Sequence, residues 1–129
     1  MAKQYNFKKF EGRNARTEDR MTLTRSYTIG FPTKFYQDNE IKKFRYAVLF
    51  WDENNSAIGI HFSNDSEEKS KFAILHSKQG YGGSVVARSF FRVNNIDPKI
   101  FHGRYDWTQE TIEGIGDIFI IELKTKENS

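Results

Sequence analysis

The sequence predicts a mainly β fold with two short helices, that is, a β-rich α+β domain. Several segments alternate polar with apolar residues, which is the pattern of half-buried strands. Aromatic residues make up 16% of the 129 positions, and this abundance favours a β-rich core in which Phe and Tyr provide much of the buried area. The chain contains no cysteine, so the hydrophobic core of one domain, and not a disulfide framework, has to stabilise it.

Residues 1–24 are expected to form a basic, largely flexible arm, because they lack apolar periodicity and are rich in Lys, Arg, Asn and Glu. The alternate aromatic residues Tyr5, Phe7 and Phe10 argue against complete disorder, since they could dock on the body or on a partner. Residues 25–129 are expected to form the single β-rich domain. The alternation that predicts its first strand, MTLTRSYTI, begins at Met21 and runs through residues 21–29.

A β-hairpin follows at residues 44–62. The run FRYAVLFW at residues 44–51 predicts a strand, DENNS is a cluster of turn residues, and AIGIHF at residues 57–62 returns as the partner strand. A polar linker at residues 65–81 then leads to the second half of the chain. It contains a predicted strand at residues 72–76 and the start of a glycine-rich loop at residues 80–83.

The second half begins with a short strand at residues 84–86 and a helix of about two turns at residues 87–94. Asp97-Pro98 is expected to end this helix, because proline disfavours α geometry in the residue before it. Further strands are predicted near residues 104–107 and at residues 117–123, where the sequence is DIFIIEL.

The two halves, about 25–64 and 82–124, carry the same pattern, which indicates an internal repeat. Both contain a strand, a short aromatic helix, an isoleucine, a strand and a tryptophan before a final strand. One inserted residue in the second half also aligns Trp51 with Trp107, the only two tryptophans of the chain. The positions that align without a gap are Pro32 with Ala87, Phe35 with Phe90, Tyr36 with Phe91, Asn39 with Asn94, and Ile41 with Ile96.

This repeated unit resembles that of the swapped-hairpin AbrB superfamily, which includes the AbrB, MazE and MraZ transcription regulators. The shared features are the short strand, the Pro or small residue, the basic-aromatic helical turn, the Ile nine residues after the Pro position, and the hairpin. The resemblance implies that two β-α-β units interlock within one chain as a compact, swapped-hairpin-like β-barrel. The second unit departs from the pattern by having Ala87 at the Pro position.

Charge is unevenly distributed along the chain, although the net charge is only +3. Residues 1–26 carry seven Lys/Arg against three Asp/Glu, and residues 69–104 carry seven against one. These two basic segments predict that the fold has one positive face. The alternative is an ordinary solvated surface on which the charges are unevenly spread. The N-terminus has no apolar signal region and no segment is long enough to cross a membrane. Together with the lack of cysteine, this favours a cytoplasmic protein with no membrane partner.

The sequence does not predict an enzyme. Its three histidines are dispersed, and no HExxH, GxSxG or P-loop spacing is present. The segment GYGGS resembles a phosphate loop only in its glycines, because Ser84-Val85-Val86 follows where a Lys-Ser/Thr pair is required. We therefore expect no catalytic residue, no metal, no cofactor and no small-molecule substrate.

The family resemblance implies that DNA is contacted by basic residues at the end of the first strand and the start of the short helix of each unit. The matching positions are Arg25, Lys34, Arg88 and Arg92. Arg88 and Arg92 lie four residues apart and so share one helical face, and the guanidinium group suits bidentate contact with phosphate or guanine. Lys78 and the backbone amides of the loop at residues 80–83 are further candidates for phosphate contact.

The sequence thus predicts a non-enzymatic DNA-binding protein, a small transcription-regulator-like factor that uses these residues and its basic arm. One alternative is a protein-interaction module with no nucleic-acid binding, and another is a binder of single strands that stacks bases on exposed aromatics. A homodimer or another protein partner is also possible.

Overall fold

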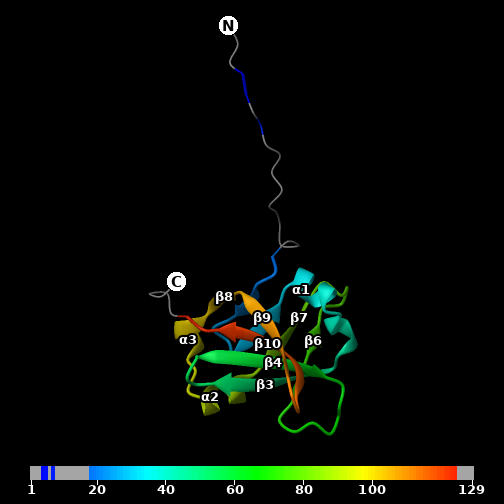
Figure 1. Ribbon diagram of the computed structural model, residues 1–129, viewed down its shortest axis with the longest axis vertical. Helices are drawn as coiled ribbons and strands as arrows, with labels where there is room; N and C mark the ends of the chain where they lie inside the picture. The colour runs from blue at the N-terminus through cyan, green and yellow to red at the C-terminus, as the bar shows by residue number, and fades with distance from the viewer. Residues whose placement is uncertain (1–3, 6, 8–17, 125–129) are drawn as a thin grey trace.

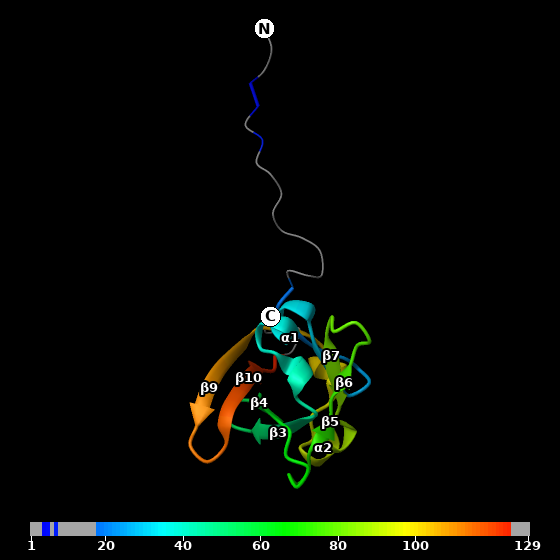
Figure 2. The same cartoon turned by 90° about the vertical axis from the view of Figure 1, so that its right-hand side faces the viewer.

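The computed structural model describes residues 4, 5, 7 and 18–124, so most of the expected arm lies outside the described residues. The fold is mainly β, as predicted, and consists of two five-stranded antiparallel sheets (Figures 1 and 2). Met21 and Leu23, which fall within the expected arm, are almost completely buried in the core. No helix in the described residues is long and apolar enough to cross a membrane.

Sheet A contains the strands that flank the two short helices. The single predicted strand at residues 21–29 is in fact two strands, β1 and β2, which pair with each other in antiparallel fashion. The reversal occurs because Tyr27 adopts a φ of 65° and the Thr24 hydroxyl accepts the amide hydrogens of Ser26 and Thr28. In spatial order the strands are β6 (Leu75–His76), β7 (Gly83–Val86), β2 (Thr28–Phe31), β1 (Met21–Leu23) and β8 (Gly103–Tyr105).

Sheet B is built around the predicted hairpin. β3 and β4 pair over their full length, from Tyr46 opposite Ser63 to Asp52 opposite Ala57. The segment predicted as a strand near residues 104–107 continues to Ile112, and its second part pairs with β10. In spatial order the strands are β5 (Phe72–Ala73), β3 (Tyr46–Asp52), β4 (Ala57–Ser63), β10 (Gly116–Glu122) and β9 (Trp107–Ile112).

The chain passes directly from an edge strand of one sheet to an edge strand of the other at two places. Only Ile74 separates β5 in sheet B from β6 in sheet A, and only Asp106 separates β8 in sheet A from β9 in sheet B. No strand pairing within the described residues joins the sheets to each other, so they are not closed into a barrel. The closed barrel therefore stays a prediction.

Three α-helices and one 3-10 helix occur in the described residues, where two short helices were expected. The additional helix is α3, and the reason is local: Pro98 occupies its first turn, where a missing N–H costs nothing, and the Asp97 carboxylate accepts the amide hydrogen of Lys99 at 2.9 Å. The sequence Asp97-Pro98 therefore begins a helix. The elements are α1 (Thr33–Asp38), η2 (Ile41–Lys43), α2 (Arg88–Val93) and α3 (Pro98–Phe101).

Aromatic rings fill the centre of the core between the sheets. Phe35 of α1 is fully buried and meets the rings of Trp107 and Phe119 edge-on, with centroids 5.0 Å apart in both cases. Phe90 and Phe91 of α2 are both buried as well. Each short helix is thus held by its aromatic pair, which leaves its polar residues at the surface.

The segments that align in sequence have the same local structure. α1 and α2 are both six residues long, and the side-chain amides of Asn39 and Asn94 donate to the carbonyls of Phe35 and Phe90 at 3.0 and 2.9 Å. The equivalent strands β2 and β7 pair with each other along their whole length. Because this pairing is antiparallel, α1 and α2 leave it at opposite ends, and they lie at the top and bottom of the molecule in both views (Figures 1 and 2).

Candidate nucleic-acid interface

Two arginines of α2 share one aromatic ring. The guanidinium carbons of Arg88 and Arg92 lie 5.4 and 5.6 Å from the centroid of the Tyr27 ring. This is the range of a cation–π contact, and it is consistent with the four-residue spacing that places both side chains on one helical face. Both arginines are exposed, and neither forms a salt bridge within the part of the chain that the structure describes.

The turn between β1 and β2 fixes Tyr27 beneath these arginines. Its backbone carbonyl accepts the amide hydrogen of Ala87, the residue that precedes α2, at 2.8 Å. Its ring also packs against Phe91, with a centroid distance of 6.1 Å. Arg25 lies two residues before Tyr27 in the same turn and is exposed. We call Arg25, Tyr27, Arg88 and Arg92 the α2-end cluster.

The other two predicted residues lie at the opposite end, beside α1. Lys34 is on α1 and forms an ion pair with Asp38 at 2.7 Å. The hydrogen bond to this carboxylate raises the pKa of Lys34. Lys78 lies in the loop that is hydrogen-bonded to α1. Of the five predicted residues, Arg88 and Arg92 therefore come together on the Tyr27 ring, Arg25 lies in the turn that carries Tyr27, and Lys34 and Lys78 lie beside α1.

The backbone of the glycine-rich loop is engaged in its own structure. The amides of Gly80 and Tyr81 donate to the carbonyl and the hydroxyl of Ser77, and the amide of Ser77 donates to the carbonyl of Gly82. Gly80 has a φ of 72°, which favours glycine, and a Cβ at Gly82 would lie 2.9 Å from the carbonyl oxygen of Phe31. The glycines therefore allow a tight turn against β2, and the Gly80 and Tyr81 amides are not available for phosphate.

Comparison of the two helices explains why their surfaces differ. Arg88 and Arg92 correspond in the alignment to Thr33 and Gln37 of α1. There, the Thr33 hydroxyl donates to the carbonyl of Tyr81, and the Gln37 amide donates to that of Gly80. At α1 these positions hold the loop, whereas at α2 the same positions carry exposed cations.

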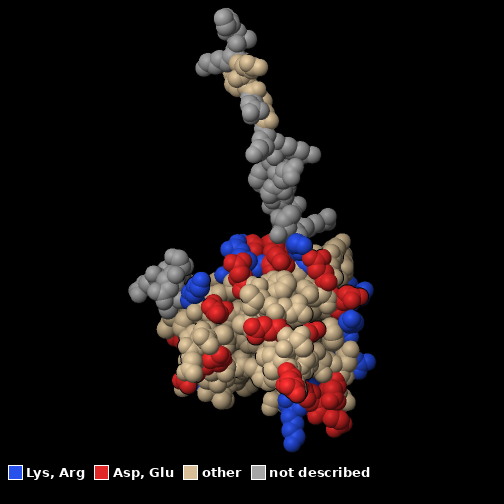
Figure 3. Space-filling model, viewed as in Figure 1, with Lys and Arg blue, Asp and Glu red and all other residues tan. Residues whose placement is uncertain are grey.

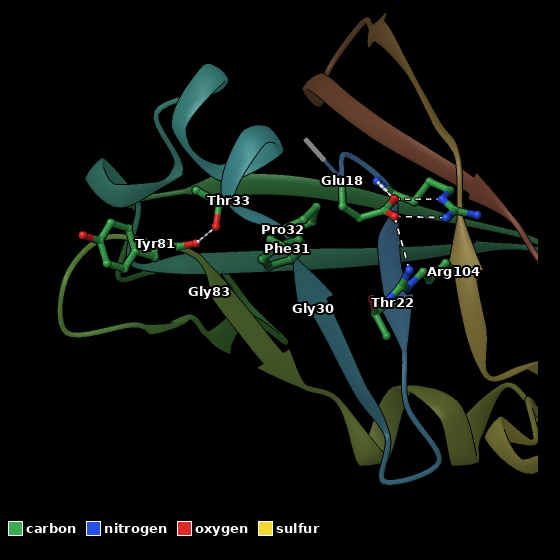
Figure 4. A pocket seen from close by; sticks show the side chains of 10 residues that line it. Glu18, Thr22, Gly30, Phe31, Pro32, Thr33, Tyr81, Gly83 and Arg104 are labelled. Atoms are coloured by element: carbon green, nitrogen blue, oxygen red, sulfur yellow. Dashed lines mark hydrogen bonds and ion pairs between the residues drawn. The ribbon is translucent and has the colours of Figure 1, made fainter. Parts of the chain in front are cut away.

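A groove of about 510 Å³ crosses the outer surface of sheet A (Figure 4). Its floor includes Thr22 and Gly30, one wall includes Pro32 and Tyr81, and an ion-pair cluster forms the other wall. The cluster consists of the Glu18 carboxylate, which accepts two hydrogen bonds from the Arg20 guanidinium at 2.8 and 3.0 Å and one from Arg104 at 3.3 Å.

The single Glu18 carboxylate in this groove is paired with two guanidinium groups, those of Arg20 and Arg104. The side-chain and backbone hydrogen bonds from Arg20 lower the pKa of Glu18 to about 2, so the carboxylate is ionised at neutral pH. Its side chain is 24% exposed. Sequence analysis placed Glu18 and Arg20 in the arm and did not single out Arg104, because nothing local indicates that chain segments about 85 residues apart meet.

The histidines with described contacts have structural partners. His76 donates from Nε2 to the carbonyl oxygen of Phe44 at 2.8 Å, and its Nδ1 therefore accepts from the Tyr36 hydroxyl at 2.7 Å. His61 lies 2.8 Å through Nδ1 from the carbonyl oxygen of Asp117. The described residues contain no group of three or more His, Asp or Glu side chains that could hold a metal ion.

Sequence analysis missed Tyr27, which organises the α2-end cluster. Its place in an alternating polar-apolar run predicted an ordinary strand residue, and no local signal reveals that α2 packs over its ring. Comparisons of the chain with protein-family models, with curated proteins and with solved structures gave no match, so the resemblance to the AbrB superfamily rests on the sequence motif alone.

Proposed function

We propose that the chain is a non-enzymatic DNA-binding protein that contacts duplex DNA through the α2-end cluster. The observation that carries the proposal is the pair of exposed guanidinium groups over the Tyr27 ring. Most surface arginines change rotamer freely, but these two have a shared aromatic support. Less side-chain entropy is therefore lost when they bind an anion.

Phosphate is the anion that suits this arrangement best. Two cations on successive turns of a helix lie about 6 Å apart along its axis, which allows them to contact neighbouring phosphates of one strand. Arg25 extends the same positive area from the adjoining turn. Because no described carboxylate is paired with these arginines, an incoming phosphate does not have to displace an internal partner.

The finer architecture and biological role belong to the same proposal. The equal local structure of the halves and the chain crossings at Ile74 and Asp106 support a barrel-like assembly of two units. Membership of the swapped-hairpin superfamily and a transcription-regulator-like role follow from the sequence resemblance, and a cytoplasmic location follows from the lack of cysteine. Lys34 and Lys78 form a second, weaker contact region in this scheme, because Lys34 is already paired with Asp38.

The test compares two double variants of equal charge change by fluorescence anisotropy with a labelled duplex. We expect Arg88→Ala/Arg92→Ala to weaken binding by about tenfold or more and to lower the slope of log K against log salt by about 2, since each phosphate contact contributes about 0.9. We expect the matched variant Lys34→Ala/Lys78→Ala to have a clearly smaller effect.

Circular dichroism would check that both variants are folded. Equal losses in the two variants would indicate a diffuse charge effect and would show that the α2-end cluster is not the site. Preferential binding of a single-stranded competitor, with quenching of Tyr or Trp fluorescence, would favour the stacking alternative. Tyr81 is the most exposed aromatic residue of the described body, at 52%, and Tyr81→Ala would then reduce that binding.

A further inference from the structure

The outer face of sheet A changes in character from one edge to the other. Directly paired residues of antiparallel strands share one face, so a single row crosses this face from β6 to β8. The row consists of Leu75, Ser84, Gly30, Thr22 and Arg104. Leu75 and Val86, which are 57% and 46% exposed, make the β6–β7 side apolar. The groove of about 510 Å³ lies over the middle and the Arg104 end of the row (Figure 4).

Gly30 leaves the floor of this groove without a side chain, although the fold does not require a glycine there. It lies inside β2, where glycine weakens a strand, and it is not among the glycines with a positive φ. A Cβ at Gly30 would make only ordinary contacts, the nearest at 3.7 Å with the Cβ of Thr22. At Gly83, by contrast, a Cβ would lie 3.1 Å from the carbonyl oxygen of Leu75. An unforced glycine within a strand is typical of a place where a ligand approaches the backbone.

The rim of the groove on the α1 side is apolar and its backbone is held in place. Pro32 and Tyr81 contribute to this rim. The carbonyl of Tyr81 accepts the Thr33 hydroxyl hydrogen, and its amide donates to the Ser77 hydroxyl at 2.8 Å. The Tyr81 residue is 52% exposed. A proline and an exposed aromatic residue at the rim of an open floor suit a planar, partly apolar group.

The opposite end of the groove can bind an anion. Two arginines and one glutamate line it, which gives a net charge of +1, and basic and acidic side chains adjoin one another at the top of the body in Figure 3. Arg20 is engaged by Glu18 through two hydrogen bonds and also lies near Asp106. The Arg104 guanidinium donates to Glu18 only through Nη1, at 3.3 Å, and its side chain is 60% exposed. Arg104 therefore has donors left for a phosphate, which a guanidinium group binds in bidentate fashion.

The distance between the two ends suits a single nucleotide. β8 and β7 are separated by three strand spacings, or about 14 Å, and the volume of the groove is in the range of small-molecule sites. A nucleotide combines a planar base with a phosphate in one short unit. Within a duplex the bases are stacked and paired, so only an unpaired nucleotide can present its base to the groove.

We propose that the groove on sheet A binds a nucleotide with an unpaired base. The base lies over Gly30 against Pro32 and Tyr81, and the phosphate accepts hydrogen bonds from Arg104. A free nucleotide and a nucleotide within a single strand have this chemistry in common. The inference does not depend on the proposed duplex binding, because the groove and the α2-end cluster share no residue.

The first test adds a side chain to the floor of the groove without changing any charge. Gly30→Val in the full chain is titrated with adenosine 5′-monophosphate and followed by amide NMR shifts. Thr28→Val is the matched control, because it lies on the same face of β2 but outside the groove lining. We expect Gly30→Val to weaken binding at least about tenfold relative to wild type and Thr28→Val. Its melting temperature should not fall, since valine favours a strand more than glycine does.

A second set of variants tests the two ends of the groove. Arg104→Ala should weaken binding of adenosine 5′-monophosphate by about tenfold through the loss of charge-assisted hydrogen bonds, and Tyr81→Ala should weaken it by about fivefold. Arg45→Ala, at an exposed arginine outside the groove, should leave binding unchanged, as should Arg88→Ala/Arg92→Ala. Much tighter binding of a single-stranded oligodeoxyadenylate would identify a strand as the source of the nucleotide, and equal affinities would identify the free nucleotide.

Four results would overturn the proposal. The wild-type chain could fail to bind both the mononucleotide and the oligonucleotide, or inorganic phosphate could bind as tightly as the mononucleotide, which would mean that the base makes no contact. Unchanged binding by Gly30→Val would place the ligand outside the groove. Loss of mononucleotide binding in Arg88→Ala/Arg92→Ala would assign it to the α2-end cluster, whereas unchanged duplex binding in that variant would contradict the proposed function alone.

Discussion

At the scale of single residues, Tyr27 and Glu18 show how one side chain can organise others that are distant in sequence. Tyr27 supports two arginines from a helix about 60 residues later. Glu18 joins Arg20 to Arg104 and so attaches the start of the body to β8. Both contacts involve partly exposed groups, for which an individual ion pair or cation–π contact contributes about 1 kcal/mol or less. Their main effect is to fix the positions of the side chains that they join.

Glu18 should make stability depend on pH in the acid range. Its pKa of about 2 in the folded chain lies below its ordinary value of 4.5, so its contribution is present above pH 4.5 and is lost as the pH falls through 2. We expect Glu18→Gln to lower the melting temperature at pH 7, and the difference from wild type to shrink steadily between pH 4.5 and pH 2.

The control for this pH series is Glu113→Gln. It makes the same charge change at an exposed turn residue that forms no salt bridge within the described residues. Thermal unfolding followed by circular dichroism provides the measurement. A Glu18→Gln difference that stayed constant from pH 7 to pH 2 would show that the ionised carboxylate does not contribute.

At the scale of elements, the two short helices depend on similar features. α1 and α2 are too short to be stable alone, and each is anchored by two buried aromatic residues and ends at an Asn that bonds back to the helix. Their surfaces nevertheless have different roles. One helix holds the glycine-rich loop, and the other presents the arginines.

Because the two helices end in the same way, the same substitution at either end should lower the free energy of unfolding by the same amount. Asn39→Ala and Asn94→Ala each remove one partly buried hydrogen bond, so each should lower the free energy of unfolding by about 0.5–1.5 kcal/mol. Urea denaturation measures both values. The equivalence would be refuted by costs that differ by more than about 1 kcal/mol, since that would mean that one of the two bonds is structurally unimportant.

At the scale of the whole molecule, the core is continuous across both sheets. One hydrophobic cluster includes residues of both halves, and the aromatic contacts of Phe35 with Trp107 and Phe119 connect the first half to the second. The hairpins of the two halves also pair with each other through β4 and β10. Neither half can therefore bury its apolar surface alone.

This continuity predicts a single cooperative unfolding transition. Each half contains one tryptophan, and both Trp51 and Trp107 pack against the core. The variants Trp51→Phe and Trp107→Phe thus report on one half each. We expect both to show the same urea midpoint by fluorescence as by far-UV circular dichroism, after allowance for their own stability changes. Separate midpoints for the two signals within either variant would indicate that the halves unfold independently.

The sequence by itself predicted the features that depend on local spacing. The alternation at residues 44–51 and 57–62 located the hairpin, and alignment of Pro32 with Ala87 located two short helices of equal form. The four-residue spacing of Arg88 and Arg92 correctly indicated a shared face. Local patterns did not reveal the turn at residues 24–27, the chain crossings at Ile74 and Asp106, or α3, because single residues and long-range pairing determine these features.

The tertiary structure alone decided which of the predicted residues come together. The antiparallel pairing of β2 with β7 sends α1 and α2 to opposite ends, so Lys34 and Lys78 lie apart from the arginines. The same register places Tyr27 beneath α2. These outcomes depend on contacts between residues far apart in the chain, and the spacing of neighbouring side chains carries no information about such contacts.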